Sequence, residues 1–177
     1  VSDPLAYLPR PTGAGLTTFA AVNVTAGPTT IGPGIYPSIS VSGNGKVKMQ
    51  AGTYVIKGGG ISASGNGRVE DDANGDGQGV FIFNACADFP ATTGACGAIS
   101  VSGNGRIELE KETSGAYAGV SIWQPCENTQ TLSVTGGGAD ASGSAGSGDG
   151  DDDEDGELET SGTIYIPCAA VSVTGHG

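Results

Sequence analysis

One short phrase recurs five times along the chain, and this repetition constrains the fold more than any other feature. The phrase, here called phrase B, reads ISVSGNG at 39–45, ISASGNG at 61–67, ISVSGNG at 99–105, LSVTGGG at 132–138 and VSVTGHG at 171–177. Recurrence of this kind is typical of repeat architectures, in which each unit buries its apolar face against its neighbours.

Two further phrases accompany phrase B in a fixed order. Phrase A, a glycine followed by alternating apolar residues, precedes it and begins at positions 34, 52, 79, 119 and 162. Phrase C follows phrase B and begins at 46, 68 and 106, with a later copy at 157–159. Because apolar side chains alternate within each phrase, the phrases are expected to be strands. The order predicts an all-β, right-handed parallel β-helix (β-solenoid) of about five coils, each with three short strands. An antiparallel sandwich with glycine-rich hairpins is the alternative, but it does not require a fixed order.

The spacing of phrase A predicts where the repeat is interrupted. Successive copies are 18, 27, 40 and 43 residues apart, so the longer repeats carry insertions, which we expect at the corners. We expect one solenoid domain over 16–177. Residues 1–15 contain Pro4, Pro9 and Pro11, which a sheet interior would reject. They are expected to form an extended lead-in that clamps a neighbouring subunit.

Three asparagines occupy the same place in phrase B. Asn44, Asn66 and Asn104 each lie between two glycines, and asparagine and glycine both tolerate the left-handed backbone of a tight corner. Stacked on neighbouring coils, about 4.8 Å apart, the three amides are expected to form a hydrogen-bonded ladder.

Three cations likewise begin phrase C. Lys46, Arg68 and Arg106 are expected to stack at equivalent corners and to pair with Glu70 and Glu108. A basic stripe that binds a polyanion is the alternative interpretation.

Composition excludes several classes of protein. Glycine supplies 33 of the 177 residues, which argues against a helical bundle because each helix-interior glycine costs about 1 kcal/mol relative to alanine. Seven lysines and arginines stand against 19 acids, a formal net charge of -12, so we expect no nucleic-acid partner. No apolar run approaches the roughly 18 residues of a membrane span, so none is expected in this chain.

The acids are concentrated in two segments that resemble calcium-binding loops. Residues 70–78 and 149–157 hold most of them, and each contains the pattern D-x-[DN]-x-[DN]-G, in which alternate oxygens turn toward a cation. The sequence therefore predicts two Ca²⁺ sites. The predicted ligands of the first are Asp72, Asn74, Asp76 and Gln78, with Glu70 or Asp71 completing the set. Those of the second are Asp151, Asp153, Asp155 and Glu157, with Asp149 or Glu159. Solvated acidic corners are the alternative.

The four cysteines suggest an oxidising compartment. They allow three pairings, of which Cys86–Cys96 would close an insertion and Cys126–Cys168 would join adjacent coils. Buried free thiols are the alternative. A zinc site is not expected, because the spacing is not CxxC and the chain has one histidine, His176.

Three stretches of the chain together carry a resemblance to a known family: the opening VSDPLAYLP, the segment GPGIYPSISVSGNGKVKMQAGTYVIKGGGISASGNG, and SGTIYIPCAAVSVTG. They resemble a domain attached to bacterial tight-adherence pilus-assembly proteins. The resemblance implies a secreted or cell-surface location. It carries over no catalytic residues. The chain departs from that family in its two acidic insertions and in showing no membrane helix ahead of the domain.

These observations favour a structural function. We expect a subunit of an extracellular filament, assembled with copies of itself by head-to-tail stacking of calcium-stabilised solenoids. A secreted adhesin or module that binds surface glycans is the alternative. An enzyme acting on polysaccharide is less favoured, because the few cations lie far along the chain from the acidic loops. Ice binding would require flat Thr-x-Thr ranks, which the repeats lack.

Overall fold

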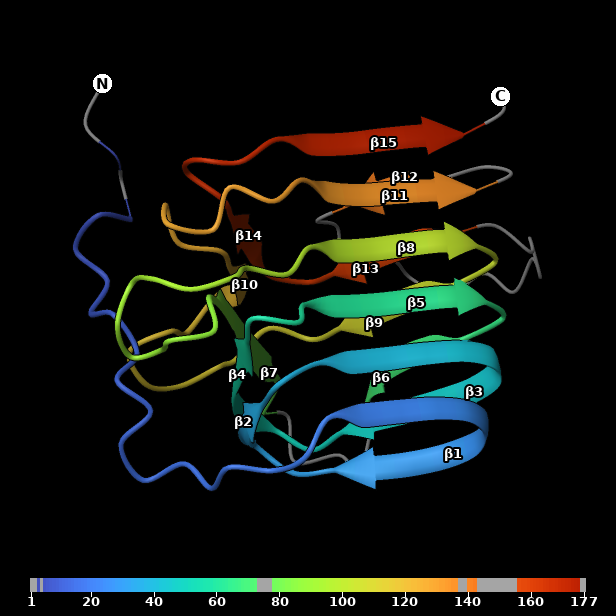
Figure 1. Cartoon of the computed structure of the whole chain (residues 1–177), viewed down its shortest axis with the longest axis horizontal. Coiled ribbons are helices and arrows are strands. Elements are labelled where there is room, and N and C mark those ends of the chain that lie inside the picture. The colour runs from blue at the N-terminus through green and yellow to red at the C-terminus, as the bar shows by residue number, and fades with distance from the viewer. Residues whose placement is uncertain (1–2, 4, 73–77, 137–139, 143–155, 176–177) are drawn as a thin grey trace.

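The chain is all-β and its strands form two parallel sheets. A computed structural model describes residues 3, 5–72, 78–136, 140–142 and 156–175 (Figure 1). The larger sheet has the strand order β12-β13-β9-β6-β3-β5-β8-β11-β15, with β1 joined to β3, and the smaller has the order β14-β10-β7-β4-β2. Across the described ranges, no helix is long and apolar enough to cross a membrane.

The three phrases correspond to these strands. Phrase A forms the smaller sheet, with strands β2 (Gly34–Tyr36), β4 (Gly52–Lys57), β7 (Val80–Ala85), β10 (Val120–Trp123) and β14 (Thr163–Tyr165). The copies of phrases B and C form the larger sheet. Its strands are β1 (Val22–Ile31), β3 (Ile39–Met49), β5 (Ile61–Gly65), β6 (Arg68–Asp71), β8 (Ile99–Gly103), β9 (Arg106–Leu109), β11 (Leu132–Gly136), β12 (Asp140–Ser142), β13 (Glu157–Thr160) and β15 (Val171–Gly175).

The long strand β3 accounts for the curl of the larger sheet. Its first half, Ile39–Val41, pairs with β5, and its second half, Lys46–Met49, pairs with β6. One strand therefore contributes to both the phrase B and the phrase C parts of the sheet. All ladders between the named strands are parallel, which is incompatible with the antiparallel sandwich.

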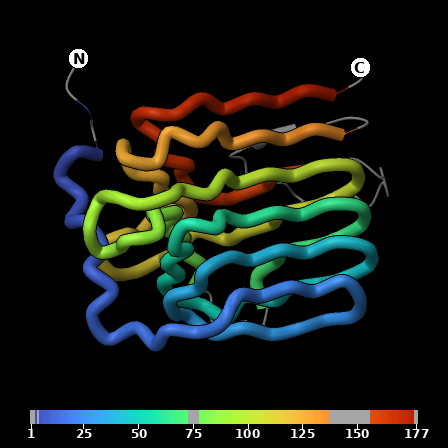
Figure 2. Tube along the Cα trace, in the orientation of Figure 1, coloured from blue at the N-terminus to red at the C-terminus, as the bar shows by residue number. Residues whose placement is uncertain are grey.

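Each repeat lies on the preceding one in register, as the stacked trace in Figure 2 shows. The inward position of phrase C, for example, carries Val47, Val69, Ile107 and Leu158 in successive strands, all at most 1% exposed. Such apolar ranks from all three phrases meet in one elongated core. The alternation in the sequence thus sets which side chains are buried, because successive residues of a strand point to opposite faces.

The smaller sheet is apolar on its outer face as well. Outward side chains that include Val55, Phe81, Phe83 and Trp123 form a second buried cluster. Phe89, from the insertion closed by Cys86 and Cys96, completes it. Part of the inserted chain is therefore packed against the sheet, where the sequence indicated only corner loops.

The lead-in also lies on its own chain. Residues 3 and 5–16, hereafter the N-terminal strap, run beside the smaller sheet from the last repeats to the first (Figure 1). The Tyr117 hydroxyl donates a hydrogen bond to the carbonyl of Pro9 at 3.0 Å, and Arg10 forms an ion pair with Glu127. Asp3 accepts a hydrogen bond from the hydroxyl of Tyr165. These contacts are intramolecular, and the clamping of a neighbouring subunit by this segment stays a prediction.

The insertion after β11 adds a strand that the sequence did not indicate. In β12, Asp140–Ser142 pair in parallel with Glu157–Glu159 of β13, on the side of β13 away from β9. A segment that precedes β13 in the chain thus covers the edge of β13. Such coverage reduces the number of unpaired backbone groups at this end of the sheet.

The glycines set the corner conformation. Gly43, Gly65 and Gly103, each preceding an asparagine of phrase B, have φ values of 57°, 62° and 63°, whereas no described residue other than glycine has a positive φ. Of the two residue types that tolerate the left-handed backbone at this corner, asparagine does not adopt it. The preceding glycine adopts it, because a residue without Cβ has no steric penalty there.

Candidate functional site

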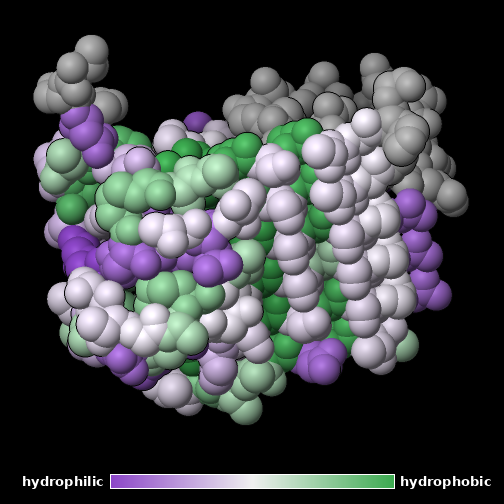
Figure 3. All heavy atoms as spheres, turned by 45° about the horizontal axis from the view of Figure 1, so that its top comes forward, coloured by the Kyte–Doolittle hydropathy of each residue, from purple (hydrophilic) through white to green (hydrophobic). Residues whose placement is uncertain are grey.

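The phrase B strands present an uncharged, hydroxyl-rich surface, hereafter the hydroxyl face. Their outward side chains are aligned from strand to strand in two ranks across the sheet. The first rank is Asn23, Ser40, Ser62, Ser100, Ser133 and Ser172. The second is Ser64, Ser102, Thr135 and Thr174. Pale columns of intermediate hydropathy cross the strands on this face in Figure 3.

This face was missed by the sequence reasoning. Neighbouring members of a rank lie about 4.8 Å apart, and the two ranks are separated by two residues, or about 6.6 Å. Thr-x-Thr itself is absent from phrase B, but the Ser-x-Ser and Ser-x-Thr patterns of this phrase provide ranks that are equally regular. The criterion of Thr-x-Thr was therefore too narrow. The signal was present in phrase B, whose second and fourth residues are hydroxylic in every copy.

The asparagine ladder borders the hydroxyl face. The side-chain amide of Asn66 donates to the Oδ1 of Asn44 at 3.0 Å, and that of Asn104 donates to the Oδ1 of Asn66 at 3.2 Å. This ladder was expected from the sequence. Its amides bond to one another between repeats, so their chemistry contributes to stacking.

Two charged ranks lie on the phrase C strands. One aligns Lys46, Arg68, Arg106 and Glu157, and the next aligns Lys48, Glu70, Glu108 and Glu159. Lys46 pairs with Glu70 at 3.2 Å, and Arg106 pairs with Glu108 at 3.7 Å and with Glu157 at 3.6 Å. The predicted pairing of cations with Glu70 and Glu108 is thus observed for Lys46 and Arg106. The Lys46–Glu70 and Arg106–Glu157 pairs link neighbouring repeats, whereas the Arg106–Glu108 pair lies within β9.

The end of the stack that carries β15 leaves apolar side chains uncovered. Val171 and Val173 are aligned with Leu132 and Val134 of β11, which are fully buried. Nevertheless, Val171 is 54% exposed and Val173 is 42% exposed. The positions have the inward register of the core, and β15 is the outermost strand at this edge of the described sheet. This edge is hereafter called the open end.

Half of the predicted calcium ligands lie outside the described residues. Asn74, Asp76, Asp149, Asp151, Asp153 and Asp155 belong to that set. Glu70, Asp71, Asp72, Gln78, Glu157 and Glu159 lie within the described chain. Among the described residues, no three histidine, cysteine or acidic side chains are grouped as they would be around a metal ion. Glu70 and Glu157 are engaged in the ion pairs with Lys46 and Arg106.

Asp71 has an unusual environment for a carboxylate. Its register partner Met49 is a core residue, so the aspartate occupies an inward position of β6. One oxygen accepts a hydrogen bond from the backbone N–H of Glu110, whereas Oδ1 is buried and has no hydrogen-bond partner. Burial raises the pKa of Asp71 to about 6, and the nearby Glu110 and Glu70 add to the shift, although the hydrogen bond opposes it.

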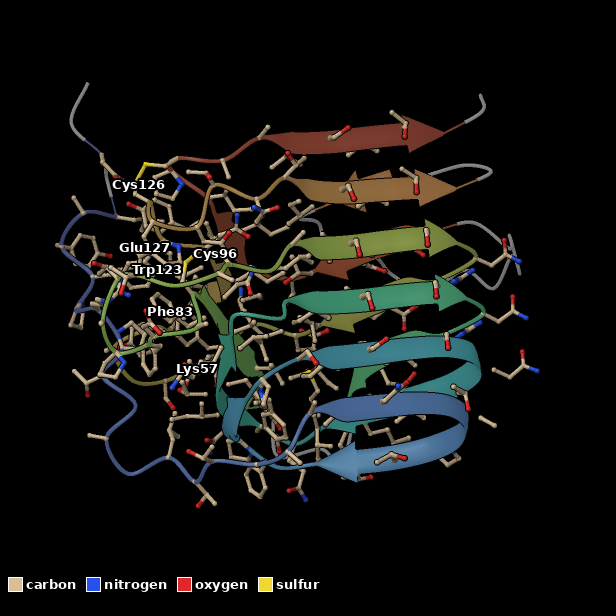
Figure 4. All side chains as sticks on the ribbon, viewed as in Figure 1. Lys57, Phe83, Cys96, Trp123, Cys126 and Glu127 are labelled. Carbon is tan, nitrogen blue, oxygen red and sulfur yellow. A yellow bond between two sulfur atoms is a disulfide. The ribbon has the colours of Figure 1, made fainter. Side chains whose placement is uncertain are left out.

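Two disulfides join the chain on the side of the strap. Cys86 is bonded to Cys96 and Cys126 to Cys168, with Cα–Cα separations of 4.2 and 4.7 Å. These are the two pairs that the sequence favours. Figure 4 shows Cys96, Cys126 and Glu127 on the strap side, away from the hydroxyl face.

A buried amide network lies within the repeats and was also missed. The amide of Asn84 donates to the Oε1 of Gln124 at 3.0 Å, and the amide of Asn128 donates to the carbonyl of Asn84 at 3.0 Å. All three side chains are fully buried. Because buried polar groups are costly when unpaired, this network fixes the repeats in one register. It has a structural effect, and the candidate functional surfaces are the hydroxyl face and the open end.

The hydroxyl face offers aligned hydrogen-bonding groups, and the open end offers an apolar edge strand that pairs, among the described strands, with β11 alone. Both suit association with an ordered surface or with another strand. No protein-family model, no curated protein and no solved structure matches the chain.

Proposed function

We propose that the protein is an extracytoplasmic structural protein, a right-handed parallel β-helix whose subunits stack head to tail into a filament. The observation that carries this proposal is the open end, where Val171 and Val173 occupy core positions of the repeat but remain about half exposed. An elongated stack whose end has uncovered apolar positions, and whose last strand pairs on one side only among the described strands, is a surface that a further repeat would complete.

The use of polar side chains supports a structural role. The asparagine ladder, the Lys46–Glu70 and Arg106–Glu157 ion pairs and the buried amide network all connect one repeat to the next. These groups therefore stabilise the stacking direction itself. Subunits of a filament need stiffness along this direction.

The compartment is supported by the disulfides. Two disulfides and no free cysteine suit an oxidising environment outside the cytoplasm. The resemblance to domains of tight-adherence pilus-assembly proteins belongs to this proposal and agrees with a surface location.

Calcium is part of the proposal as a stabilising ion. Asp71 supports it, because a partly buried carboxylate with one unbonded oxygen and a raised pKa would gain a favourable partner in a cation. Asp72 follows it directly in the chain, and the remaining predicted ligands of this loop are Asn74, Asp76 and Gln78.

The proposal is tested by electron microscopy and analytical ultracentrifugation of the full chain at high concentration with calcium. We expect unbranched fibres whose axis follows the stacking direction, and a sedimentation coefficient that rises with protein concentration. A chain that sediments as a monomer throughout, without fibres, would contradict the filament.

The hydroxyl face favours a second candidate, a secreted adhesin or glycan-binding module. Its two hydroxyl ranks lie in an uncharged surface, and their hydroxyl groups repeat at the spacing of adjacent strands. Such a surface can exchange hydrogen bonds with the hydroxyl groups of an ordered polysaccharide. Binding would then be largely independent of ionic strength, since no charge takes part.

This candidate is tested by cosedimentation with insoluble cellulose and chitin. The double variant Ser100→Glu/Ser133→Glu places charges in the centre of the hydroxyl face, and Lys48→Glu is a matched control on the phrase C strands. We expect the wild type and the control to cosediment and the double variant to remain in solution. Equal behaviour of all three proteins would exclude this face as the binding surface.

A further inference from the structure

We infer that subunits join by parallel pairing of β15 of one copy with the first half of β1 of the next copy, so that the larger sheet continues across the joint. The inference rests on the proposed function and names the contact surface for it. The partner is a second copy of this chain, because its first strand repeats the pattern of its last.

The two strand edges are available at opposite ends of the stack. Among the described strands, β15 is hydrogen-bonded only to β11 and β1 only to β3. In Figure 1, β1 and β15 lie at opposite ends of the stack. Joining one to the other is a head-to-tail contact, which propagates along the stack axis instead of closing into a dimer.

The side chains at the two edges match position for position. Within the chain, Val22–Asn23–Val24 of β1 align with Ile39–Ser40–Val41 of β3, and Val171–Ser172–Val173 of β15 align with Leu132–Ser133–Val134 of β11. Both end strands therefore carry apolar, polar and apolar side chains at the same register positions. Across the joint, Val171 would lie over Val22 and Val173 over Val24, while Ser172 and Asn23 would continue the first rank of the hydroxyl face.

The smaller sheet extends this match by one further contact. Phe19 is 41% exposed at the β1 end, and its ring stacks on that of Tyr36 with centroids 5.0 Å apart. The inward position that Phe19 and Tyr36 share continues through Ile56 and Asn84, which are register partners. Toward the other end of the stack, the same inward position is occupied by Gln124 and then by Ile166, which directly follow the aligned Trp123 and Tyr165. Ile166 is only partly buried. In the joined stack, Ile166 of one copy would cover Phe19 of the next.

The second half of β1 is unsuited to pairing, so the pairing across the joint is limited to the first half of this strand. It contains Pro28, which is exposed and lacks a backbone N–H. A proline in an edge strand disfavours added pairing there. The joint therefore depends on the phrase B part of the sheet, where both valines of β15 are exposed.

Cysteine crosslinking of the full chain tests the register. Ser172 and Asn23 would be direct neighbours across the joint, about 4.8 Å apart and within the range of a disulfide. The double variant Asn23→Cys/Ser172→Cys should form a ladder of covalent oligomers on mild oxidation. The matched control Asn23→Cys/Thr174→Cys is displaced by two residues and should form no such ladder. Peptide mapping verifies that the two native disulfides are retained in both variants.

A second variant tests the apolar contact without crosslinking. Val173→Lys alters a side chain that is 42% exposed in the single chain, so folding should be unaffected, as circular dichroism can verify. The expected result is loss of oligomers in sedimentation. Fibres that persist in Val173→Lys, or crosslinks that are equal in the matched and displaced pairs, would overturn this joint while leaving the filament function intact. Wild-type protein that never assembles would overturn both.

Discussion

The two glycines of the Gly-Asn-Gly corner at 65–67 are required for different physical reasons. Gly65 has a φ of 62°, a conformation that side chains with a Cβ rarely adopt. Gly67 has an ordinary φ, but a Cβ at this position would lie 2.6 Å from the carbonyl oxygen of Val41 in the preceding repeat. The first glycine is thus needed for the turn, and the second for the close approach of neighbouring repeats.

Replacing the second glycine should weaken the stack. We expect Gly67→Ala to lower the free energy of unfolding by about 1–3 kcal/mol, because backbone atoms of two repeats must separate to admit the methyl group. Ser102→Ala, on the outward side of β8, is the control and should change it by less than about 0.5 kcal/mol. Denaturant unfolding followed by circular dichroism measures both. Equal midpoints for Gly67→Ala and wild type would show that the repeats are not so closely stacked.

Asp71 predicts a pH dependence of stability in the absence of calcium. Its pKa is raised from 3.8 to about 6 on folding, so the folded chain binds more protons than the unfolded chain between these values. The contribution of this group to stability is therefore most favourable below pH 3.8 and is lost as the pH rises through 6.

The variant Asp71→Asn should be more stable than wild type at pH 7.5 by about 1–2 kcal/mol. This difference is smaller than the free energy that a pKa shift of this size implies, because the carboxylate is partly exposed. The amide oxygen can still accept the N–H of Glu110. The difference should shrink below pH 6, whereas Ser102→Ala, which removes no ionisable group, should show no such trend. Unfolding curves in chelator at several pH values measure it, and a constant difference would contradict the assignment.

At the scale of elements, the repeated phrases were sufficient to predict the strands and contacts that recur in every repeat. The phrase order predicted parallel strands, and the corner asparagines and phrase C cations predicted specific contacts such as Asn66 with Asn44 and Lys46 with Glu70. The strap and β12 could not be predicted in this way. Their positions depend on single, unrepeated residues such as Arg10 and Glu127, which have no periodic signal in the sequence.

The strap should contribute to stability through Arg10. Its guanidinium pairs with Glu127 and lies over the ring of Phe83, 5.1 Å from the centroid, with both charged side chains largely buried. We expect Arg10→Met to cost about 1–2 kcal/mol, because Glu127 would be left without its ion-pair partner. A double-mutant cycle with Glu127→Gln measures the coupling between the two side chains. Additive effects of the two substitutions would show that the strap is not held by this pair.

At the scale of the whole molecule, charge is the feature that most opposes compaction. The net charge of -12 arises chiefly from two short acidic segments, while the remainder of the chain is nearly balanced. Within the described residues, the phrase C ranks already pair Glu70 and Glu157 with cations of neighbouring repeats, and Glu108 with Arg106 of its own strand. The acidic segments are thus the place where a bound cation would change stability most.

Calcium should therefore raise the thermal unfolding midpoint of the full chain relative to chelator. A ligand that binds only the folded state adds about 2.7 kcal/mol at a hundredfold excess over its dissociation constant. Asp72→Asn/Asp76→Asn and Asp151→Asn/Asp153→Asn separate the two segments, and each pair should remove part of the calcium-dependent increase. Magnesium is the control ion, since it requires a more regular octahedral site and should raise the midpoint less. Identical midpoints in calcium and chelator would leave both segments as solvated acidic corners, and the stack would then depend on its core, ladders and disulfides alone.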